Sequence, residues 1–403
     1  MPRMSAVRQG RDDTTGVARF ALRAGAMFDG VGSALVADPL LLIEGTRLLT
    51  VEPAGRNPPG IPVVDLGAVT LLPGLIDTHV HLAFDSGLDP VGSLARRTDA
   101  EVTEAMATAA RAHLAAGVTT IRDLGDRGYL SLTLRGRDDL PTILCAGPPV
   151  TTPAGHCHYL GGGAEPTEAA VRRAVREHAE HDVDVIKIMA SGGTLTPGTR
   201  QEDAQFPSAV LAAAVDEAHR LGLPVTAHAH GTSAIIDALA AGVDGIEHAS
   251  FWSAEGVDSR VDVLTELAER RVVIGATVGM IEVPGLQPPP QVASRMPALL
   301  TNHRRLHDLG GVFVAGTDAG IAPIKPHGVL VRALPMLHEL GLSPAAALRA
   351  VTSVAAEATG LGARKGRLAP GFDADLIAVE GDPLADPSAL QRVVAVYTAG
   401  IRR

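Results

Sequence analysis

From about residue 68 onward, short β-branched runs alternate with Ala- and Leu-rich segments of helical period, and this alternation most constrains the fold. The pattern is typical of βα units built around a parallel sheet. Eight units can be counted, which favours a closed barrel over an open sheet. The predicted strands end near His79, Asp123, Gly147, Met189, His228, His248, Ala276 and Asp318.

The segments outside this alternation predict a second, smaller body. Residues 18–67 and 361–403 contain short apolar runs joined by Gly, Asp and Pro turns, so we expect them to meet as one small β-sandwich. The predicted fold class is therefore α/β, with a (β/α)8 TIM-like barrel over residues 68–360. Residues 1–17 are polar and rich in Arg and Asp, and they are predicted to be a disordered tail.

Charge and composition narrow the classes of function. A net charge of −10 and the lack of a Lys/Arg block argue against nucleic acid or a membrane as a partner. The first seventeen residues lack the apolar core of a signal peptide. Cys145 and Cys157 form no CxxC pair, which fits a reducing cytoplasm. We expect a cytoplasmic protein that acts on a small molecule and that could form a homo-oligomer.

Lysine is scarce, because the chain contains only Lys187, Lys325 and Lys365. We interpret Lys325 and Lys365 as ordinary cations, since Lys and Arg are interchangeable at most surface positions. Lys187 lies in the apolar run VDVIKIM, where desolvation favours the neutral amine. A neutral amine can react with carbon dioxide to form a carbamate that bridges two cations. The alternative is a core lysine paired with a carboxylate.

Several metal-binding residue types are predicted at one end of the barrel. His79 and His81 in DTHVH project to the same side of their strand, because strand residues alternate faces. His228, His248 and Asp318 stand at the same end of their own strands, where barrel enzymes build their active sites. An HxH pair alone is weak, but the convergence predicts a metal centre.

These motifs resemble the amidohydrolase superfamily, and within it the imidazolonepropionase-like or prolidase-like (Xaa-Pro dipeptidase-like) group. The matching stretches, spread over about residues 20–400, are LLPGLIDTHVHL, VIKIMASGG, TAHAHG, GIEHAS, GTDAG, PHG and LAPGFDADLIAVEGDPL. The resemblance implies two divalent cations. Its ligands here would be His79, His81 and Asp318 for the first cation, His228 and His248 for the second, and N6-carboxylated Lys187 as the bridge.

The implied ligands predict hydrolytic chemistry. Imidazole and carboxylate suit Zn²⁺, although cobalt or manganese could occupy the same ligands. Two cations about 3.5 to 4 Å apart would share a bridging water and lower its pKa toward neutrality. Asp318 would accept the proton of the resulting hydroxide and return it to the leaving nitrogen. Asp77 and Asp123 could orient ligand imidazoles or serve as structural hydrogen-bonding groups.

Other polar residues near these motifs are candidates for substrate contact. His230 follows His228 at strand spacing, so we expect it to face the same pocket and to act on substrate or on the developing oxyanion. The turn after Lys187 would allow close backbone approach. The predicted substrate contacts are His156, His158, Tyr159, Gly192, Gly193, His230 and His327. The alternatives are solvated loop histidines, a plain turn and, for His327, a residue at a helix N-terminus.

The leading prediction is hydrolysis of an amide C–N bond in a small molecule, most simply a dipeptide or an N-acyl amino acid. The same metal pair could instead open a cyclic amide, carbamate, urea or lactone, because only the electrophile differs. A mononuclear deaminase would lack the bridging lysine and would normally carry an HxxE pair, whereas Gly231 and Thr232 follow His230. An inactive binding scaffold would be expected to have lost a metal ligand, and all six are present.

Two loops are predicted to set substrate specificity. They contain TLTPGTRQEDAQFP, after the fourth strand, and GMIEVPGLQPPPQVASR, after the seventh. Arg200 or Arg295 on these loops could pair with a substrate carboxylate, although a surface role is commoner for an arginine.

Overall fold

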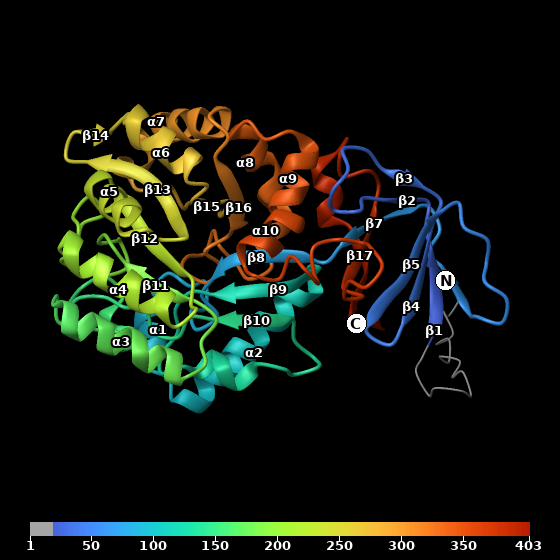
Figure 1. The fold of residues 1–403 in the computed structure, drawn as a ribbon, viewed down its shortest axis with the longest axis horizontal. Helices are drawn as coiled ribbons and strands as arrows, with labels where there is room; N and C mark the ends of the chain where they lie inside the picture. Colours follow the sequence, from blue (N-terminus) through green and yellow to red (C-terminus); the bar gives the residue numbers. More distant parts are fainter. Residues whose placement is uncertain (1–18) are drawn as a thin grey trace. The chain divides into compact units, whose positions relative to one another are not determined.

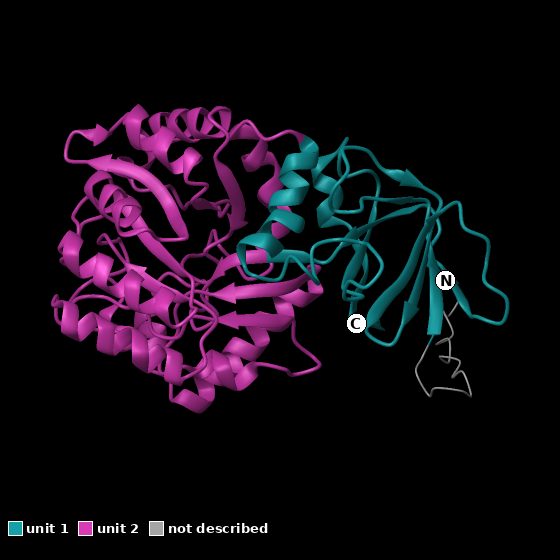
Figure 2. Cartoon of the chain, in the orientation of Figure 1, with its two compact units in different colours: residues 1–76, 344–403 teal, residues 77–343 magenta. Residues whose placement is uncertain are grey.

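The computed structural model describes residues 19–403, and the predicted tail over residues 1–17 lies outside this range. The described chain divides into two compact units (Figure 2). Unit 1 contains residues 19–76 and 344–403, and unit 2 contains residues 77–343. The domain boundaries expected from the sequence, at 67/68 and 360/361, remain predictions.

Unit 1 is built mainly from two β-sheets. The first has the order β5-β4-β1-β6, with β1 (Arg19–Arg23), β4 (Pro39–Glu44), β5 (Arg47–Pro53) and β6 (Val63–Asp65). The second has the order β19-β18-β17-β7-β2-β3, with β2 (Ala26–Met27), β3 (Val36–Ala37), β7 (Val69–Pro73), β17 (Leu376–Glu380), β18 (Val393–Thr398) and β19 (Ile401–Arg402). Its helical segments are α9 (Pro344–Ala350), α10 (Ser353–Ala358) and the 3-10 turn η4 (Pro387–Gln391).

The early and late parts of the chain meet in this unit. Strand β17 pairs antiparallel with β7, and Leu376 lies opposite Pro73. One hydrophobic core draws buried side chains from both sheets, among them Leu22, Leu41 and Tyr397. The pairing and the shared core explain why two segments far apart in sequence form one unit.

Lys365 is part of the interior of unit 1. Its side chain is only 4% exposed and forms ion pairs with Asp375 and, at 3.3 Å, with Asp373. The interpretation of Lys365 as an ordinary surface cation is therefore wrong. The two carboxylates compensate for the cost of burying the ammonium group.

Unit 2 alternates parallel strands with helices (Figure 1). The strands in this series are β8 (Leu75–Val80), β9 (Val118–Asp123), β10 (Thr142–Cys145), β11 (Ile186–Met189), β12 (Val225–Gly231), β13 (Gly245–Ser253), β15 (Val273–Thr277) and β16 (Val312–Gly316). β8, β9 and β11 are buried at every position, as expected for parallel strands that are covered on both faces. The short strand β14 (Gly256–Val257) pairs antiparallel with β13.

The helices of unit 2 lie outside these strands (Figure 1). They are α1 (Pro90–Ala95), α2 (Asp99–Ala115), α3 (Glu168–Glu180), α4 (Ser208–Arg220), α5 (Thr232–Ala241), α6 (Val261–Glu269), α7 (Pro290–Asp308) and α8 (Ala333–Glu339), with 3-10 turns η1 (Leu130–Leu134), η2 (His158–Leu160) and η3 (Val329–Arg332). In α2, Thr98 and Glu101 form a capping box. Val102, Met106 and Ala110 recur every four residues and form its buried face.

The strand ladders of unit 2 form two sheets. The orders are β10-β9-β8 and β11-β12-β13-β15-β16. Isolated parallel bridges join Val80 to Ala319 and Val150 to Ile188, at the two places where the ladders stop. The structure therefore shows an α/β unit with parallel sheets in the predicted strand order, and the ladders themselves do not run around one continuous closed sheet.

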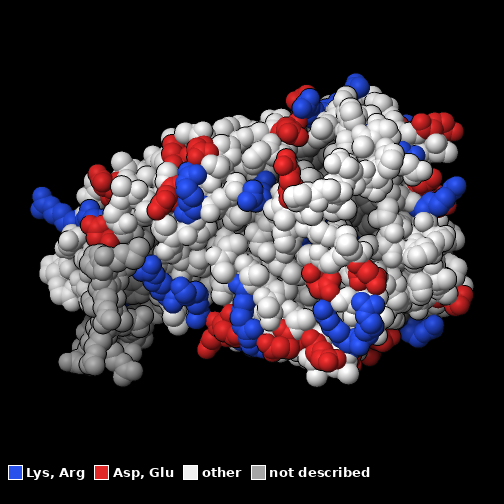
Figure 3. Space-filling view, turned by 180° about the vertical axis from the view of Figure 1, so that it is seen from behind, with Lys and Arg blue, Asp and Glu red and all other residues white. Residues whose placement is uncertain are grey.

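The surface agrees with the composition. On the face shown in Figure 3, basic and acidic side chains intermingle. None of the helices within residues 19–403 combines the length and the apolar character needed to cross a membrane.

Candidate active site

His79, His81 and Asp318 form what we call the first cluster. His79 comes from β8, His81 follows that strand, and Asp318 follows β16. The Nε2 atoms of His79 and His81 are 3.2 Å apart. Asp318 Oδ1 lies 3.2 Å from His81 Nε2 and 3.5 Å from His79 Nε2. Three potential ligand atoms thus point at one position.

Hydrogen bonds on the far side of each ring fix which nitrogen faces this position. His79 Nδ1 lies 3.0 Å from Glu247 Oε2, and His81 Nδ1 lies 3.2 Å from the Gly125 carbonyl. Both partners are acceptors, because the cationic neighbours of Glu247 hold its pKa below the usual range despite burial. Each ring therefore donates through Nδ1 and presents the Nε2 lone pair inward when it is neutral. The Asp318 carboxylate adds a third acceptor, so a cation or a proton has to occupy the centre.

The electrostatics of the first cluster favour positive charge at that centre. Burial lowers the pKa of His79 to about 4, so this ring is neutral at pH 7. Burial also opposes protonation of His81, but the hydrogen bond and charge of Asp318 outweigh it and raise the His81 pKa. The same imidazoles overcome the effect of burial on Asp318 and lower its pKa, so the carboxylate stays ionised.

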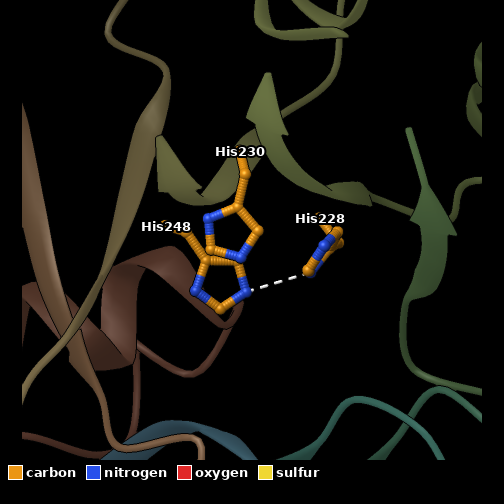
Figure 4. A group of neighbouring side chains, drawn as sticks. All are labelled: His228, His230 and His248. Atoms are coloured by element: carbon orange, nitrogen blue, oxygen red, sulfur yellow. Dashed lines mark hydrogen bonds between the residues drawn. The ribbon is translucent and has the colours of Figure 1, made fainter. Parts of the chain in front are cut away.

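His228, His230 and His248 form the second cluster (Figure 4). His228 Nε2 donates to the Gly192 carbonyl at 3.1 Å, which leaves Nδ1 as the acceptor. His248 Nε2 lies 3.0 Å from that Nδ1, and His248 Nδ1 lies 2.6 Å from Thr277 Oγ1. The His230 ring stacks on His248 at 4.4 Å between centroids, and its Nδ1 lies 2.8 Å from Ser250 Oγ. Burial lowers the pKa of all three histidines, which favours the neutral imidazole form.

Lys187 and a close ring contact connect the two clusters. The ring centroids of His79 and His248 are 5.4 Å apart. Lys187, on β11, is 1% exposed, and its Nζ has no hydrogen-bond partner among the described residues. Burial lowers its pKa to about 8. An unsatisfied buried amine is costly, and carboxylation would replace it with two oxygens that can bind cations.

Two residues of the clusters have unusual backbone conformations. His248 has φ +71° and Asp318 has φ +59°, in the left-handed region that side chains rarely adopt. Each position costs on the order of 1–3 kcal/mol and persists only because the surrounding contacts impose it. The unusual backbone accompanies the inward direction of His248, within β13, and of Asp318, just after β16.

A cavity of about 310 Å³ opens onto both clusters. Its wall includes His79, His81, Lys187, His228, His230, His248 and Asp318. Most of the remaining wall is apolar, with Met189, Trp252, Leu299, Ile321 and Met336 among its residues. Such a wall suits a substrate with a hydrophobic side chain or acyl group. Lys325 also lines the cavity and is only 4% exposed, so its interpretation as an ordinary surface cation is wrong.

The predicted substrate contacts divide into two groups. His156 lines the cavity, and its ring lies 4.8 Å from that of His228. The Gly192 carbonyl binds His228, as described above. A Cβ at Gly193 would come within 2.3 Å of His156 Nε2, so glycine is required for this close approach. Together with His230, these residues lie at the clusters.

His158, Tyr159 and His327 are not among the residues that line the described cavity. His158 is exposed and bonds the Gly155 carbonyl, and the Tyr159 hydroxyl contacts Cys157 Sγ. His327 Nε2 donates to the Phe84 carbonyl at 2.9 Å. His327 therefore supports the backbone beside Phe84, a residue of the cavity wall.

Asp77 and Asp123 accept hydrogen bonds from backbone N–H groups, and Asp77 also from a hydroxyl, instead of from the imidazoles of the clusters. Asp77 accepts from Thr317 N at 3.0 Å and Thr317 Oγ1 at 2.7 Å. Asp123 accepts from Leu82 N and Gly125 N. The role of orienting an imidazole belongs to Glu247, a residue that was not predicted from the sequence. Arg122 Nη2 and Thr226 Oγ1 hold Glu247 at 3.0 and 2.7 Å. The sequence feature that could have indicated this role is the Glu next to His248 in the apolar strand segment GIEH.

The two arginines considered for a substrate carboxylate have protein partners. Arg200 pairs with Asp203 at 2.7 Å. The Arg295 guanidinium lies 4.6 Å from the centroid of the Trp252 ring and donates to the Ser253 carbonyl.

Comparisons with known proteins place this chain in a family. The model of the amidohydrolase family matches residues 70–402. Ochratoxinase from Aspergillus niger is 30% identical over 369 residues, which cover 81% of this chain and 73% of the relative. Imidazolonepropionase from Cereibacter sphaeroides is 28% identical over 396 residues, covering 91% and 94% of the two chains. A solved Xaa-Pro dipeptidase with bound methionine in the active site has a TM-score of 0.83 at 25% identity, over 96% of this chain and 100% of that one.

The superfamily resemblance inferred from the motifs is confirmed by these matches. The chain belongs to the amidohydrolase family and is a hydrolase that acts on carbon–nitrogen bonds.

Proposed function

We propose that this hydrolase is binuclear and metal-dependent, and that it cleaves the amide bond of a dipeptide or an N-acyl amino acid. The observation that carries the proposal is the convergence of His79 Nε2, His81 Nε2 and Asp318 Oδ1 on one position. Neutral imidazoles and a carboxylate are ligands that Zn²⁺ prefers.

The residues of the site fit two cations. His79, His81 and Asp318 would hold the first, and His228 and His248 the second. N6-carboxylated Lys187 would bridge them, which accounts for a buried amine without a partner among the described residues. When bound, the cations would polarise the scissile carbonyl and lower the pKa of a shared water toward neutrality.

The chain's own side chains would move the protons and bind the substrate. The ionised Asp318 carboxylate is placed to accept the proton of the attacking water and to return it to the leaving nitrogen. His230 can accept from the Ser250 hydroxyl through Nδ1, which frees its Nε2–H to donate to the developing oxyanion.

We also propose that the eight parallel strands close as a (β/α)8 barrel and that the sheets of unit 1 form a β-sandwich.

The substrate class rests on two supports. The cavity wall is mainly apolar outside the clusters, which favours a hydrophobic group next to the scissile bond. The Xaa-Pro dipeptidase that this chain resembles carries a free amino acid, methionine, in its active site. A small amino-acid amide satisfies both conditions.

The test is to load the purified protein with Zn²⁺ and bicarbonate, count the bound metal by mass spectrometry, and follow amine release from dipeptides and N-acyl amino acids. We expect two metals per chain and hits grouped by their amino acid. His79→Ala should lose turnover, whereas the control His219→Ala, on an exposed residue paired with Asp244, should retain it. Unchanged turnover in His79→Ala would refute the proposal. If two metals were bound but only cyclic amides, carbamates or lactones were hydrolysed, the proposed substrate class would be wrong and one of these compounds would take its place.

A further inference from the structure

Lys325 is a buried cation in the wall of the cavity, outside both clusters. It lies on the segment between β16 and η3, and its side chain is 4% exposed. Asp318 belongs to the same segment and lines the same cavity. Burial lowers the pKa of Lys325 to about 8, so the group still carries a positive charge at pH 7.

The backbone around Lys325 is fixed by three hydrogen bonds. Its N–H donates to the Ala322 carbonyl at 2.8 Å, and its own carbonyl accepts from Gly320 N at 2.8 Å and from Ser86 Oγ at 3.1 Å. The ammonium group therefore starts from an ordered position, which reduces the entropy lost when it binds a ligand.

The ammonium group forms no direct ion pair in the described part of the chain, although the carboxylates of Asp318 and Asp77 act on its charge at longer range. Lys325 Nζ donates to the Gly279 carbonyl at 2.9 Å and takes part in no ion pair with a described carboxylate. Lys365, the other buried lysine that bonds a protein group, pairs with two aspartates. An ammonium has three donors, and a buried charge without an opposite charge is costly. An anionic ligand in the cavity would give the ammonium group a direct ion pair.

We propose that Lys325 binds the carboxylate of the amino acid released by hydrolysis, so that the substrates are amides whose leaving amine carries a carboxylate. This inference rests on the proposed function. Asp318 would protonate the leaving nitrogen, and Lys325 lies on the same segment and lines the same cavity. Lys325 is therefore placed to bind a carboxylate carried by the leaving amine. A carboxylate and an ammonium in an apolar wall make a strong, charge-assisted contact.

A pair of substrates that differ only in this carboxylate tests the inference. N-acetyl-L-leucine and N-acetylisopentylamine present the same acetamide and the same branched chain, and the second has no carboxylate. In the metal-loaded protein we expect Lys325→Met to lower kcat/KM about 100-fold for N-acetyl-L-leucine and to leave the neutral amide unchanged. An equal loss on both amides would mean that Lys325 only supports Asp318 or the metal ligands, and would overturn the inference.

A binding measurement separates this inference from the proposed function. Trp252 is the only tryptophan of the chain and lines the cavity, so its fluorescence can report ligand binding without turnover. N-acetyl-L-leucine should bind more tightly than N-acetylisopentylamine, and Lys325→Met should remove the difference. If neither compound is hydrolysed but this difference depends on Lys325, the anion site stands and the proposed substrate class fails.

Two further variants separate the charge of Lys325 from its hydrogen bond and from the charge of Arg295. Lys325→Gln keeps a donor for the Gly279 carbonyl and removes the charge, so it should behave like Lys325→Met even if the methionine variant folds poorly. Arg295→Met removes the cation that lies over the Trp252 ring. The inference fails if the preference for the carboxylate disappears in Arg295→Met and persists in Lys325→Gln.

Discussion

The two histidine clusters use the same side chain in different hydrogen-bonding states. In the first, both rings donate outward to acceptors, and their lone pairs face each other and the Asp318 carboxylate. In the second, the Thr277 hydroxyl can donate to His248 Nδ1, which allows His248 Nε2–H to donate to His228 Nδ1. The first cluster therefore needs an added positive charge, whereas the donors and acceptors of the second can form hydrogen bonds with one another. We expect the first cluster to bind its cation more tightly.

Asp318→Asn should have the largest effect on turnover, and it should weaken metal binding at the first cluster alone. The change removes the proposed anionic ligand and proton acceptor, so kcat should fall about 10³-fold. The metal count should drop from two toward one per chain. Metal analysis beside steady-state kinetics checks this, and loss of both metals would show that the clusters do not bind independently.

Lys187→Ala should affect both clusters, because the proposed bridge is shared. We expect both metals to bind weakly and turnover to fall more than about 100-fold, since a ligand is worth more than a group that only orients one. Added acetate should restore part of the activity by placing a carboxylate in the vacated space. In the unmodified protein, a carbamate signal in ¹³C NMR after loading with labelled bicarbonate would establish the bridge directly. A Lys187→Ala variant that keeps two tight metals would contradict it.

Glu247→Gln tests the support of the first cluster. Glu247 is the acceptor for His79 Nδ1, and groups of this kind typically change metal affinity 10- to 100-fold, so we expect about that loss at the first cluster. Competition with a chelator gives the two affinities. If Glu247→Gln lowered the affinity for the second cation and left the affinity for the first unchanged, Glu247 would have to be assigned to the second cluster.

Thr277→Val is the matched change at the second cluster and should have the smallest effect. It removes a neutral hydrogen bond to His248, so affinity for the second cation should fall about fivefold. The same chelator titration measures it. If Thr277→Val proves as damaging as Glu247→Gln, the second cluster is not self-sufficient and the comparison fails.

Much of the fold follows from sequence periodicity. The predicted strand ends at Asp123 and Met189 coincide with the ends of β9 and β11, because the β-branched runs are long and bounded by clear turns. The clusters follow from the same pattern, since the carboxyl ends of parallel strands converge. The proposed closure of the barrel is harder to predict, because it depends on isolated pairings such as Val80 with Ala319 that lie outside the main ladders.

The site also depends on contacts that periodicity does not encode. Glu247 and His248 are neighbours that simple alternation would place on opposite faces of β13. The left-handed backbone at His248 breaks that alternation and brings both toward His79. Lys325 and His327 lie on an irregular segment and His158 begins the short 3-10 turn η2, and at such positions sequence spacing says little about the direction of a side chain. Only tertiary packing decides that Lys325 lines the cavity and His158 lies in solvent.

The pairing of β7 with β17 also determines when unit 1 can finish folding during biosynthesis. Strand β7 precedes unit 2 in the chain, yet its antiparallel partner leaves the ribosome only after unit 2 is complete. Until then β7 has an open edge that can pair with strands of other nascent chains. A chaperone that shields this edge should raise the yield of folded protein, and ribosomes stalled before residue 376 should accumulate aggregation-prone chains.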